Sequence, residues 1–421
     1  MKIAFVIQRY GPHVAGGAEQ LCRQVARRLA GTFNTTILTT TARNFETWAG
    51  PDSFAPGVEI VEGLTVHRFA VERPRRPRLF VWQTRVLRRL PHPLAYERKW
   101  IEWQGPYAPQ LIEHLRRRPA EYDAVLFVSF RYYPSYFGLP VVPSRAALIP
   151  TAERDPTLRL KAFRERFQRT PAFIFLTEEE RDLVCSVADI SKARSLIAGH
   201  GVDAPAPIQP GAFVRKYGPR LGLAEADGSR SRAVTSDPAP LVLYVGRVVE
   251  NKGCGRLFRA FLRYLSERPD SQARLVLAGE IAMPIPAHER IAALGRLEEA
   301  DKAAALRDCA VFVMPSPYES LSIATLEAMA AGMPVLANGE CDVLRGHCRR
   351  SGAGIAYAGD REFIRGLEQL LSHPRQREDM GAAGQDYIAR NFAWPVVTAK
   401  YVEFLRELIS GARGTTGTPG T

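Results

Sequence analysis

Charged residues in the second half of the chain have types and spacings suited to a phosphate-bearing ligand. Arg247 and Lys252 stand in "GRVVENKG", directly after an apolar run. An arginine and a lysine can neutralise a diphosphate, and the guanidinium can do so with two parallel N–H groups. Glu319 and Glu327 follow a second apolar run, with seven residues between them. An acidic pair at this separation occurs by chance in many chains, so its meaning depends on the residues around it.

The segment Phe312–Asn338, "FVMPSPYESLSIATLEAMAAGMPVLAN", predicts the elements that position these groups. Its beginning continues an apolar run, Ala310–Met314, which is typical of a buried strand. Two prolines then set a loop, and we expect Ser322 to be the N-cap of a helix over Ala324–Ala331. A helix N-terminus offers free amides and a partial positive charge, so the amides of Leu321–Ile323 favour a phosphate.

Glycines stand at two other turns from strand to helix. Gly16 and Gly17 lie between a predicted strand over Lys2–Ile7 and a helix that begins at Ala18. Gly246 follows a predicted strand over Leu241–Val245 and opens the loop that contains Arg247. Glycine lets the backbone approach a phosphate or a sugar closely, although a tight turn without a ligand would use the same residues.

These motifs together resemble a known family. The order of buried strand, "PSPYESLS", helix and "EAMAAGMPVLA" is similar to the donor-site motif of family-4 retaining glycosyltransferases, which belong to glycosyl transferases group 1 and have the GT-B fold. "GRVVENKG" and "GGAE" are similar to two further elements of that family. The resemblance covers Lys2 to about Leu408 and is strongest in the second half.

The resemblance implies a retaining, metal-independent glycosyltransferase of the hexosyltransferase type. Such an enzyme moves a sugar from a nucleotide-diphosphate sugar to a hydroxyl of a glycan or lipid-linked acceptor, here in the synthesis of a surface polysaccharide or glycolipid. No cofactor is expected, because the nucleotide sugar is a co-substrate and no Asp-x-Asp motif follows a predicted strand. The alternatives are a non-catalytic or nucleic-acid-binding GT-B-like protein and a nucleotide-sugar epimerase.

The resemblance also assigns roles to residues of the donor site. Glu319, Arg247 and Lys252 are the expected catalytic residues: Glu319 orients the donor sugar, and the two cations hold the diphosphate. The other expected donor-binding residues are Gly16, Gly17, Gly246, Arg296, Leu297, Ser320, Leu321, Ser322 and Glu327. Among these, Glu327 would accept hydrogen bonds from the ribose diol, and Arg296 and Leu297 would contact the base.

The acceptor side departs from the family pattern at two places. Many members have a histidine after the strand that here precedes "PTAERDP", where this chain has Glu153 and Arg154. Glu153 or Asp155 would then form that wall of the site. His200 stands where the family usually has asparagine. Ser322 also replaces a glycine that is common after "ES".

Strands and helices alternate along the chain, which predicts an α/β protein. The 421 residues suffice for two domains. The resemblance implies the GT-B arrangement, in which two doubly wound, Rossmann-like domains face a cleft and a C-terminal helix crosses back to the first domain. We expect an acceptor domain at 1–204, a donor domain at 205–390, a returning helix at 391–410 and a disordered tail at 411–421. The polar stretch over 222–240 is expected to be a flexible surface insertion.

Arginine dominates the net charge of +13, which favours anionic partners without choosing among them. The segment from Arg73 to Gly105 is rich in arginine, with Phe80, Trp82, Trp100 and Trp103 interleaved. Such a segment suits an anionic membrane surface or a lipid-linked acceptor, single-stranded nucleic acid, or a solvated helix whose aromatic rings pack inward. We expect no nucleic-acid partner.

No apolar run is long enough to span a bilayer, and no signal-peptide cleavage region follows the first strand. A cytoplasmic location is therefore expected, peripheral to the inner face of the membrane if the basic segment binds it. The six cysteines are dispersed and lack the spacing of a zinc site, so we expect reduced thiols. Cys341, His347 and Cys348 lack an evident fourth ligand for a metal.

Overall fold

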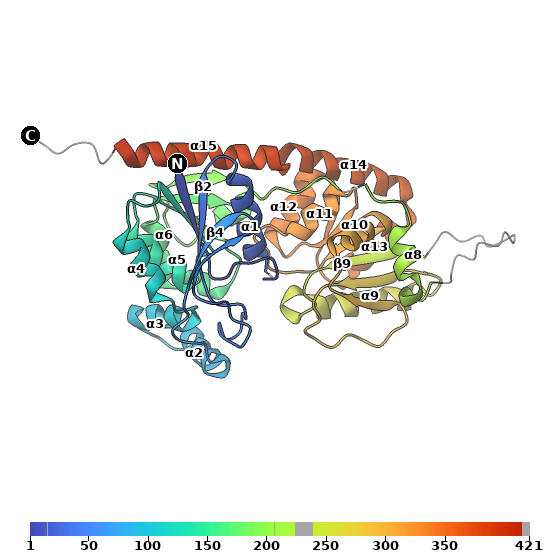
Figure 1. The fold of residues 1–421 in the computed structure, drawn as a ribbon. Coiled ribbons are helices and arrows are strands. Elements are labelled where there is room, and N and C mark those ends of the chain that lie inside the picture. Colours follow the sequence, from blue (N-terminus) through green and yellow to red (C-terminus); the bar gives the residue numbers. More distant parts are fainter. Residues whose placement is uncertain (15, 206, 224–238, 415–421) are drawn as a thin grey trace, which may run out of the picture. The chain divides into compact units, whose positions relative to one another are not determined.

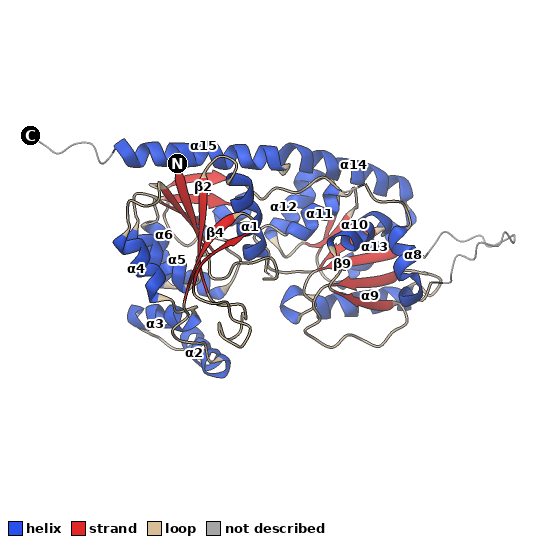
Figure 2. Ribbon diagram, in the orientation of Figure 1, coloured by secondary structure: helices blue, strands red, loops and turns tan. Residues whose placement is uncertain are grey.

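The computed structural model describes residues 1–14, 16–205, 207–223 and 239–414. The chain divides into two compact units, Met1–Gly201 with Pro395–Thr421, and Val202–Trp394. Figure 1 shows the order of the elements along the chain, and Figure 2 shows that each unit is built on a sheet with helices against it.

The first unit is built on an eight-stranded sheet. Its strands are β1 (Lys2–Val6), β2 (Asn34–Thr40), β3 (Gly57–Val61), β4 (Leu64–Phe69), β5 (Ala124–Val128), β6 (Ala146–Ile149), β7 (Ala172–Phe175) and β8 (Arg194–Ile197). They lie in the order β3-β4-β2-β1-β5-β6-β7-β8, and every neighbouring pair is parallel except β3 with β4. The order runs outward in both directions from β1 and β5, which is the doubly wound pattern.

Helices cover both faces of this sheet. They are α1 (Gly17–Leu29), α2 (Pro77–Arg89), α3 (Leu94–Gln104), α4 (Pro109–Arg117), α5 (Tyr133–Gly138), α6 (Lys161–Gln168), α7 (Glu178–Cys185) and α15 (Trp394–Gly414). Ala4 and Val6 of β1 face a core shared with α3 to α6. Tyr401 of α15 is fully buried within electrostatic reach of Cys22 on α1, so the last helix packs into the first unit.

The second unit has a six-stranded, all-parallel sheet. Its strands are β9 (Leu241–Val245), β10 (Arg274–Ala278), β11 (Ile291–Gly295), β12 (Val311–Met314), β13 (Val335–Asn338) and β14 (Gly354–Tyr357). Their order is β11-β10-β9-β12-β13-β14, so the winding direction reverses between β9 and β12. The helices are α8 (Ala212–Tyr217), α9 (Cys254–Glu267), α10 (Glu299–Asp308), α11 (Ile323–Ala330), α12 (Asp342–Ser351), α13 (Asp360–Ser372) and α14 (Pro374–Asn391).

The expected tail is wrong at its beginning. Helix α15 continues to Gly414, whereas we expected order to end near residue 410. Packing explains the difference: Arg194 at the sheet edge donates from Nη1 to the carbonyl of Glu407 at 3.0 Å, and its guanidinium lies against Gly411. Residues 415–421 and most of the predicted insertion, 224–238, lie outside the described residues.

Among the described helices, none is both long and apolar enough to cross a membrane.

Candidate functional site

The candidate donor site lies in the second unit where the winding of the sheet reverses. Strands β9 and β12 are parallel neighbours there, with Val311 opposite Val242. The loops that follow them leave the same edge of the sheet, and this is the position at which open α/β sheets bind ligands. The first loop contains Gly246, Arg247 and Lys252, and the second contains Glu319 to Ser322.

A direct ion pair joins the two loops. Lys252 Nζ lies 2.7 Å from Glu319 Oε1, and the two side chains are 34% and 13% exposed. The neighbouring Gly253 makes this approach possible, because its φ is +76° and an added Cβ would stand 2.3 Å from the carbonyl oxygen of Pro315. The structure therefore brings two of the three expected catalytic residues into contact.

Arg247 belongs to the same loop and is exposed. Its carbonyl accepts a 2.9 Å hydrogen bond from the hydroxyl of Tyr244 on β9. Burial raises the pKa of Tyr244, the charge of Glu319 raises it further, and the charge of Arg247 lowers it. Arg247 and Glu319 therefore lie within electrostatic reach of one phenol, which places all three predicted catalytic residues around one edge of the sheet.

Ser322 differs from the expected N-cap in its side chain. It stands directly before α11, but it has left-handed φ and ψ of 66° and 72° and makes no side-chain capping bond. Its hydroxyl instead lies 2.8 Å from the hydroxyl of Thr325. A left-handed conformation is unusual for a residue with a Cβ, whereas glycine adopts it readily. This explains why glycine is common at this position in the family that the sequence resembles.

Glu327 faces a lysine that sequence reasoning missed. Lys302 on α10 lies 3.1 Å from Glu327 Oε1 and 2.9 Å from Glu299 Oε2. Burial raises the pKa of Glu327, and Lys302 opposes that rise. Burial also acts against the charge of Lys302, but the two carboxylates outweigh it and raise the pKa of the lysine. Lys302 therefore offsets part of the cost of burying the charge of Glu327.

The expected base-contacting residues follow β11. Arg296 is exposed and Leu297 is half-buried in the loop that connects β11 to α10, the helix of Lys302. A second residue missed from the sequence, Asn338 at the end of β13, donates from Nδ2 to the carbonyl of Pro315 at 3.1 Å. An asparagine at the end of an apolar run was the available signal for it.

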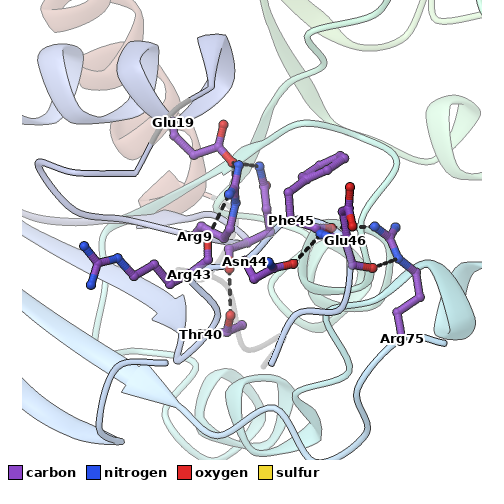
Figure 3. A network of polar contacts seen from close by, with 9 residues as sticks. Arg9, Glu19, Thr40, Arg43, Asn44, Phe45, Glu46 and Arg75 are labelled. Carbon is purple, nitrogen blue, oxygen red and sulfur yellow. Dashed lines mark hydrogen bonds and ion pairs between the residues drawn. The ribbon is translucent and has the colours of Figure 1, made fainter. Parts of the chain in front are cut away.

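In the first unit, the glycine turn is held by a buried ion pair. Glu19 Oε1 accepts from Nε and Nη2 of Arg9 at 2.9 and 2.7 Å (Figure 3). Gly16 has φ of +151°, and a Cβ there would stand 2.0 Å from Glu19 Oε2. Gly17 begins α1 with nothing near its missing Cβ. The "GGAE" element thus uses Gly16 and Glu19 for structure and leaves Gly17 open.

The expected acceptor residues follow later strands of the first unit: Glu153 and Asp155 follow β6, and His200 follows β8. Asp155 Oδ1 accepts from the amide of Thr157 at 2.7 Å, and Oδ2 lies 3.4 Å from Arg131. Burial opposes the charge of Asp155, but Arg131 and Thr157 outweigh it and lower the pKa. Glu153 is half-buried in the same loop. Burial lowers the pKa of His200 to about 3, so its ring is neutral near pH 7.

A cluster of arginine and aromatic side chains follows β2 and β4. Arg75 donates from Nε to the carbonyl of Glu46 at 2.7 Å (Figure 3). Its guanidinium also lies over the rings of Phe45 and Trp48. Trp48 packs edge-on against Tyr132, with ring centroids 5.6 Å apart. The sequence did not predict this cluster, because its residues lie far apart in the chain. They meet only where the loops after β2, β4 and β5 come together at one edge of the sheet.

Comparison with known structures identifies the architecture. A sucrose-phosphate synthase from Thermosynechococcus elongatus aligns with a TM-score of 0.67 at 17% identity, covering 97% of this chain and 99% of that one. The Anabaena protein HepE, solved with UDP and glucose, aligns with a TM-score of 0.66 at 15% identity, covering 97% and 100%. The fold is therefore GT-B, as expected from the sequence.

Sequence comparison agrees for the donor half of the chain. Residues 239–373 match the family model described as glycosyl transferases group 1, which confirms the resemblance over that segment. A GDP-mannose-dependent mannosyltransferase from Corynebacterium glutamicum that acts on a phosphatidylinositol monomannoside is 25% identical over 47% of this chain and 55% of its own length. A D-inositol 3-phosphate glycosyltransferase from Streptomyces bingchenggensis is 26% identical over 64% and 60%. The chain thus spans between half and two thirds of these relatives. The family-4 subclass stays a prediction.

Gly253→Ala tests the close contact beneath the ion pair. We expect a loss of about 2 to 4 kcal/mol in unfolding free energy, because left-handed strain adds to the clash with the Pro315 carbonyl. Gly352→Ala is the matched control, since its φ is +67° with nothing near the added Cβ. It should lose only about 1 kcal/mol. Urea unfolding measures both, and equal losses would contradict the contact.

Lys302→Met tests the compensation of Glu327. The native pKa of Glu327 is raised, so protonation favours the folded state, and the variant should regain stability as the pH falls towards the ordinary carboxyl pKa. At pH 8 we expect a loss of about 1 to 3 kcal/mol, reduced from a fully buried pair because both side chains are partly exposed. Glu327→Gln in the same background should remove the pH dependence.

The control is Glu299→Gln, which removes the other carboxylate partner of Lys302, one that is 88% exposed. A pH-independent loss in Lys302→Met would refute the account.

Proposed function

We propose that this chain is a retaining glycosyltransferase that moves a sugar from a nucleoside-diphosphate donor to a hydroxyl acceptor without needing a metal ion. One observation supports this most: the contact between Lys252 and Glu319, at the point where the sheet reverses direction, inside the segment that matches glycosyl transferases group 1. The named activities of the relatives agree with it, including the mannosyltransferase that uses GDP-mannose.

The proposed chemistry follows from the charge that develops during transfer. As the anomeric bond stretches, the ring gains oxocarbenium character and the diphosphate gathers negative charge. Lys252, Arg247 and the first amides of α11 would stabilise that charge more in the transition state than in the ground state. This cationic set supplies the neutralisation for which other enzymes use a metal.

Glu319 would change partners when the donor binds. In the present structure its carboxylate accepts from Lys252. When the lysine moves to the diphosphate, the carboxylate can accept from hydroxyls of the donor sugar and orient it. The acceptor hydroxyl would then form the new bond at the anomeric carbon and give its proton to the departing phosphate oxygen on the same face, so the configuration is retained.

The catalytic proposal predicts that Lys252→Ala and Glu319→Gln each lower kcat by about 100- to 1000-fold, because each removes a group that acts on the transition state. Lys216→Ala is the control, since Lys216 forms a 2.7 Å ion pair with Asp301 on an exposed surface of the same unit. The assay is sugar transfer or hydrolysis with a panel of nucleotide sugars, with melting temperatures confirming the fold.

Near-normal turnover in both variants would reject the assigned roles. Thermal protection by UDP or GDP separates the classes of function, because a nucleotide-binding enzyme gains stability from them. Protection by short RNA alone, lost with added salt, would favour the nucleic-acid alternative.

We further propose that α2 holds the first unit against an anionic membrane, where a lipid-linked acceptor would be reached. Every charged residue from Arg73 to Arg89 is an arginine. Trp82 is 59% exposed, and Leu79 and Leu90 are also exposed on the same helix or at its end. Arg88 of α2 lies 3.7 Å from Asp155, so this helix adjoins the loop after β6.

The other aromatic side chains of the segment pack inward. Phe80 stacks on the buried Trp100 with ring centroids 5.5 Å apart, and Trp103 packs edge-on against Tyr96. Inward packing therefore accounts for Phe80, Trp100 and Trp103. It does not account for Trp82, which is exposed. An exposed tryptophan on a helix whose charged residues are all arginines suits the interface of an anionic bilayer.

The membrane proposal predicts that Arg85→Ser with Arg89→Ser weakens binding to phosphatidylglycerol-containing vesicles by about 2 kcal/mol, or roughly 30-fold. Trp82→Ser should weaken it as well, whereas Ile60→Ser, a change at a similarly exposed apolar residue on edge strand β3, should not. Vesicle sedimentation at low salt measures this. Equal binding by wild type and the arginine variant, or none by wild type, would refute the surface.

A further inference from the structure

The peptide between Leu321 and Ser322 determines where the donor-site amides point. It connects the loop of Glu319 to α11, and Ser322 takes its left-handed conformation there. In a trans peptide the C=O and the N–H point in opposite directions. A group that holds the carbonyl of Leu321 therefore also fixes the direction of the Ser322 amide, away from itself.

His347 is that group. It is fully buried on α12, and its Nε2 lies 3.0 Å from the carbonyl oxygen of Leu321. Because a carbonyl only accepts, Nε2 must bear a proton, and in the neutral imidazole Nδ1 is then the acceptor. The hydroxyl of Tyr387 on α14 lies 3.1 Å from Nδ1 and is the matching donor.

The chain of hydrogen bonds continues beyond Tyr387. Nε of Arg350 donates to the Tyr387 hydroxyl oxygen at 3.5 Å, which leaves the hydroxyl proton directed at His347. The imidazole also packs edge-on against the rings of Tyr387 and Phe392, with centroids 6.1 and 5.7 Å away. These contacts fix both the tautomer and the plane of the ring.

Helix α12 also begins near this loop. Burial raises the pKa of the Cys341 thiol, directly before the helix, to about 11, and the backbone of Glu319 lowers it slightly. The hydrogen bond from His347 to Leu321 joins α12 to the loop. A buried histidine that only filled space would not require this directed chain of donors and acceptors.

We propose that His347 is a positioning residue for the donor diphosphate. By holding the Leu321 carbonyl, with Tyr387 fixing its tautomer, it presents the Ser322 amide to a phosphate oxygen of a nucleoside diphosphate. This inference rests on the proposed function for the identity of the ligand, but the holding of the peptide is a property of the protein alone.

The test compares His347→Leu, His347→Gln and Tyr387→Phe. His347→Leu removes the donor to Leu321, and we expect roughly tenfold weaker binding of UDP or GDP by titration calorimetry, whichever wild type prefers. His347→Gln can still donate to the carbonyl and should restore much of the affinity. Tyr387→Phe removes the hydroxyl that fixes the tautomer of His347, so nucleotide affinity should fall, but by less than in His347→Leu.

Two further measurements separate this role from general stability. His114→Leu is the control, because His114 also pairs with a buried tyrosine, Tyr122, at 3.2 Å but lies in the first unit. It should lower the melting temperature without changing nucleotide affinity. Hydrogen exchange of ligand-free protein over 319–324 should be faster in His347→Leu and close to wild type in His347→Gln.

Unchanged exchange in His347→Leu would overturn the inference whether or not a nucleotide binds. If exchange responds but wild type binds neither UDP nor GDP, the proposed function fails while the holding of the peptide stands. If wild type binds and His347→Leu binds equally well, only the positioning role is rejected.

Discussion

The second unit depends on holding a cation and a carboxylate together at the reversal point of its sheet. Lys252 and Glu319 are 34% and 13% exposed, and an ion pair at that exposure contributes little to stability. Close packing of the backbone beneath it nevertheless requires Gly253, and Asn338 holds Pro315 from the next strand. Under the proposed function this pair serves binding, and each charge would be compensated until a ligand replaces its partner.

Backbone strain gathers at the same kind of place in both units. Among the described residues, the non-glycine residues with positive φ are Trp48, Glu62, Ser129, Thr151 and Ser322. All except Glu62 follow the carboxyl end of a parallel strand, in the loops after β2, β5, β6 and β12. Such conformations persist only where surrounding contacts impose them, as His347 does at Ser322. The strand ends are therefore held in shape before any ligand arrives.

The sequence predicted what local patterns determine. The apolar run over Leu241–Val245 gave the bounds of β9 correctly, and the strand predicted over Lys2–Ile7 is β1, which ends one residue earlier. Contacts that join distant segments were not predictable: nothing near Glu327 announces Lys302, and a histidine between two cysteines gives no sign of its bond to Leu321. The end of α15 was missed for the same reason, because its last turn depends on Arg194, far away in the chain.

The net charge of +13 shows why composition cannot locate a binding site. Several arginines of the first unit are used internally: Arg9 pairs with Glu19, Arg68 donates to the carbonyl of Tyr10, and Arg145 donates to that of Tyr122. These guanidinium groups replace missing backbone partners at strand ends and loops, which is a structural use of charge. Exposed cations such as Arg85 and Arg89 on α2 or Arg247 after β9 differ in kind, because their charge faces solvent. A surplus of arginine therefore favours an anionic partner only where the structure leaves the guanidinium groups facing outward.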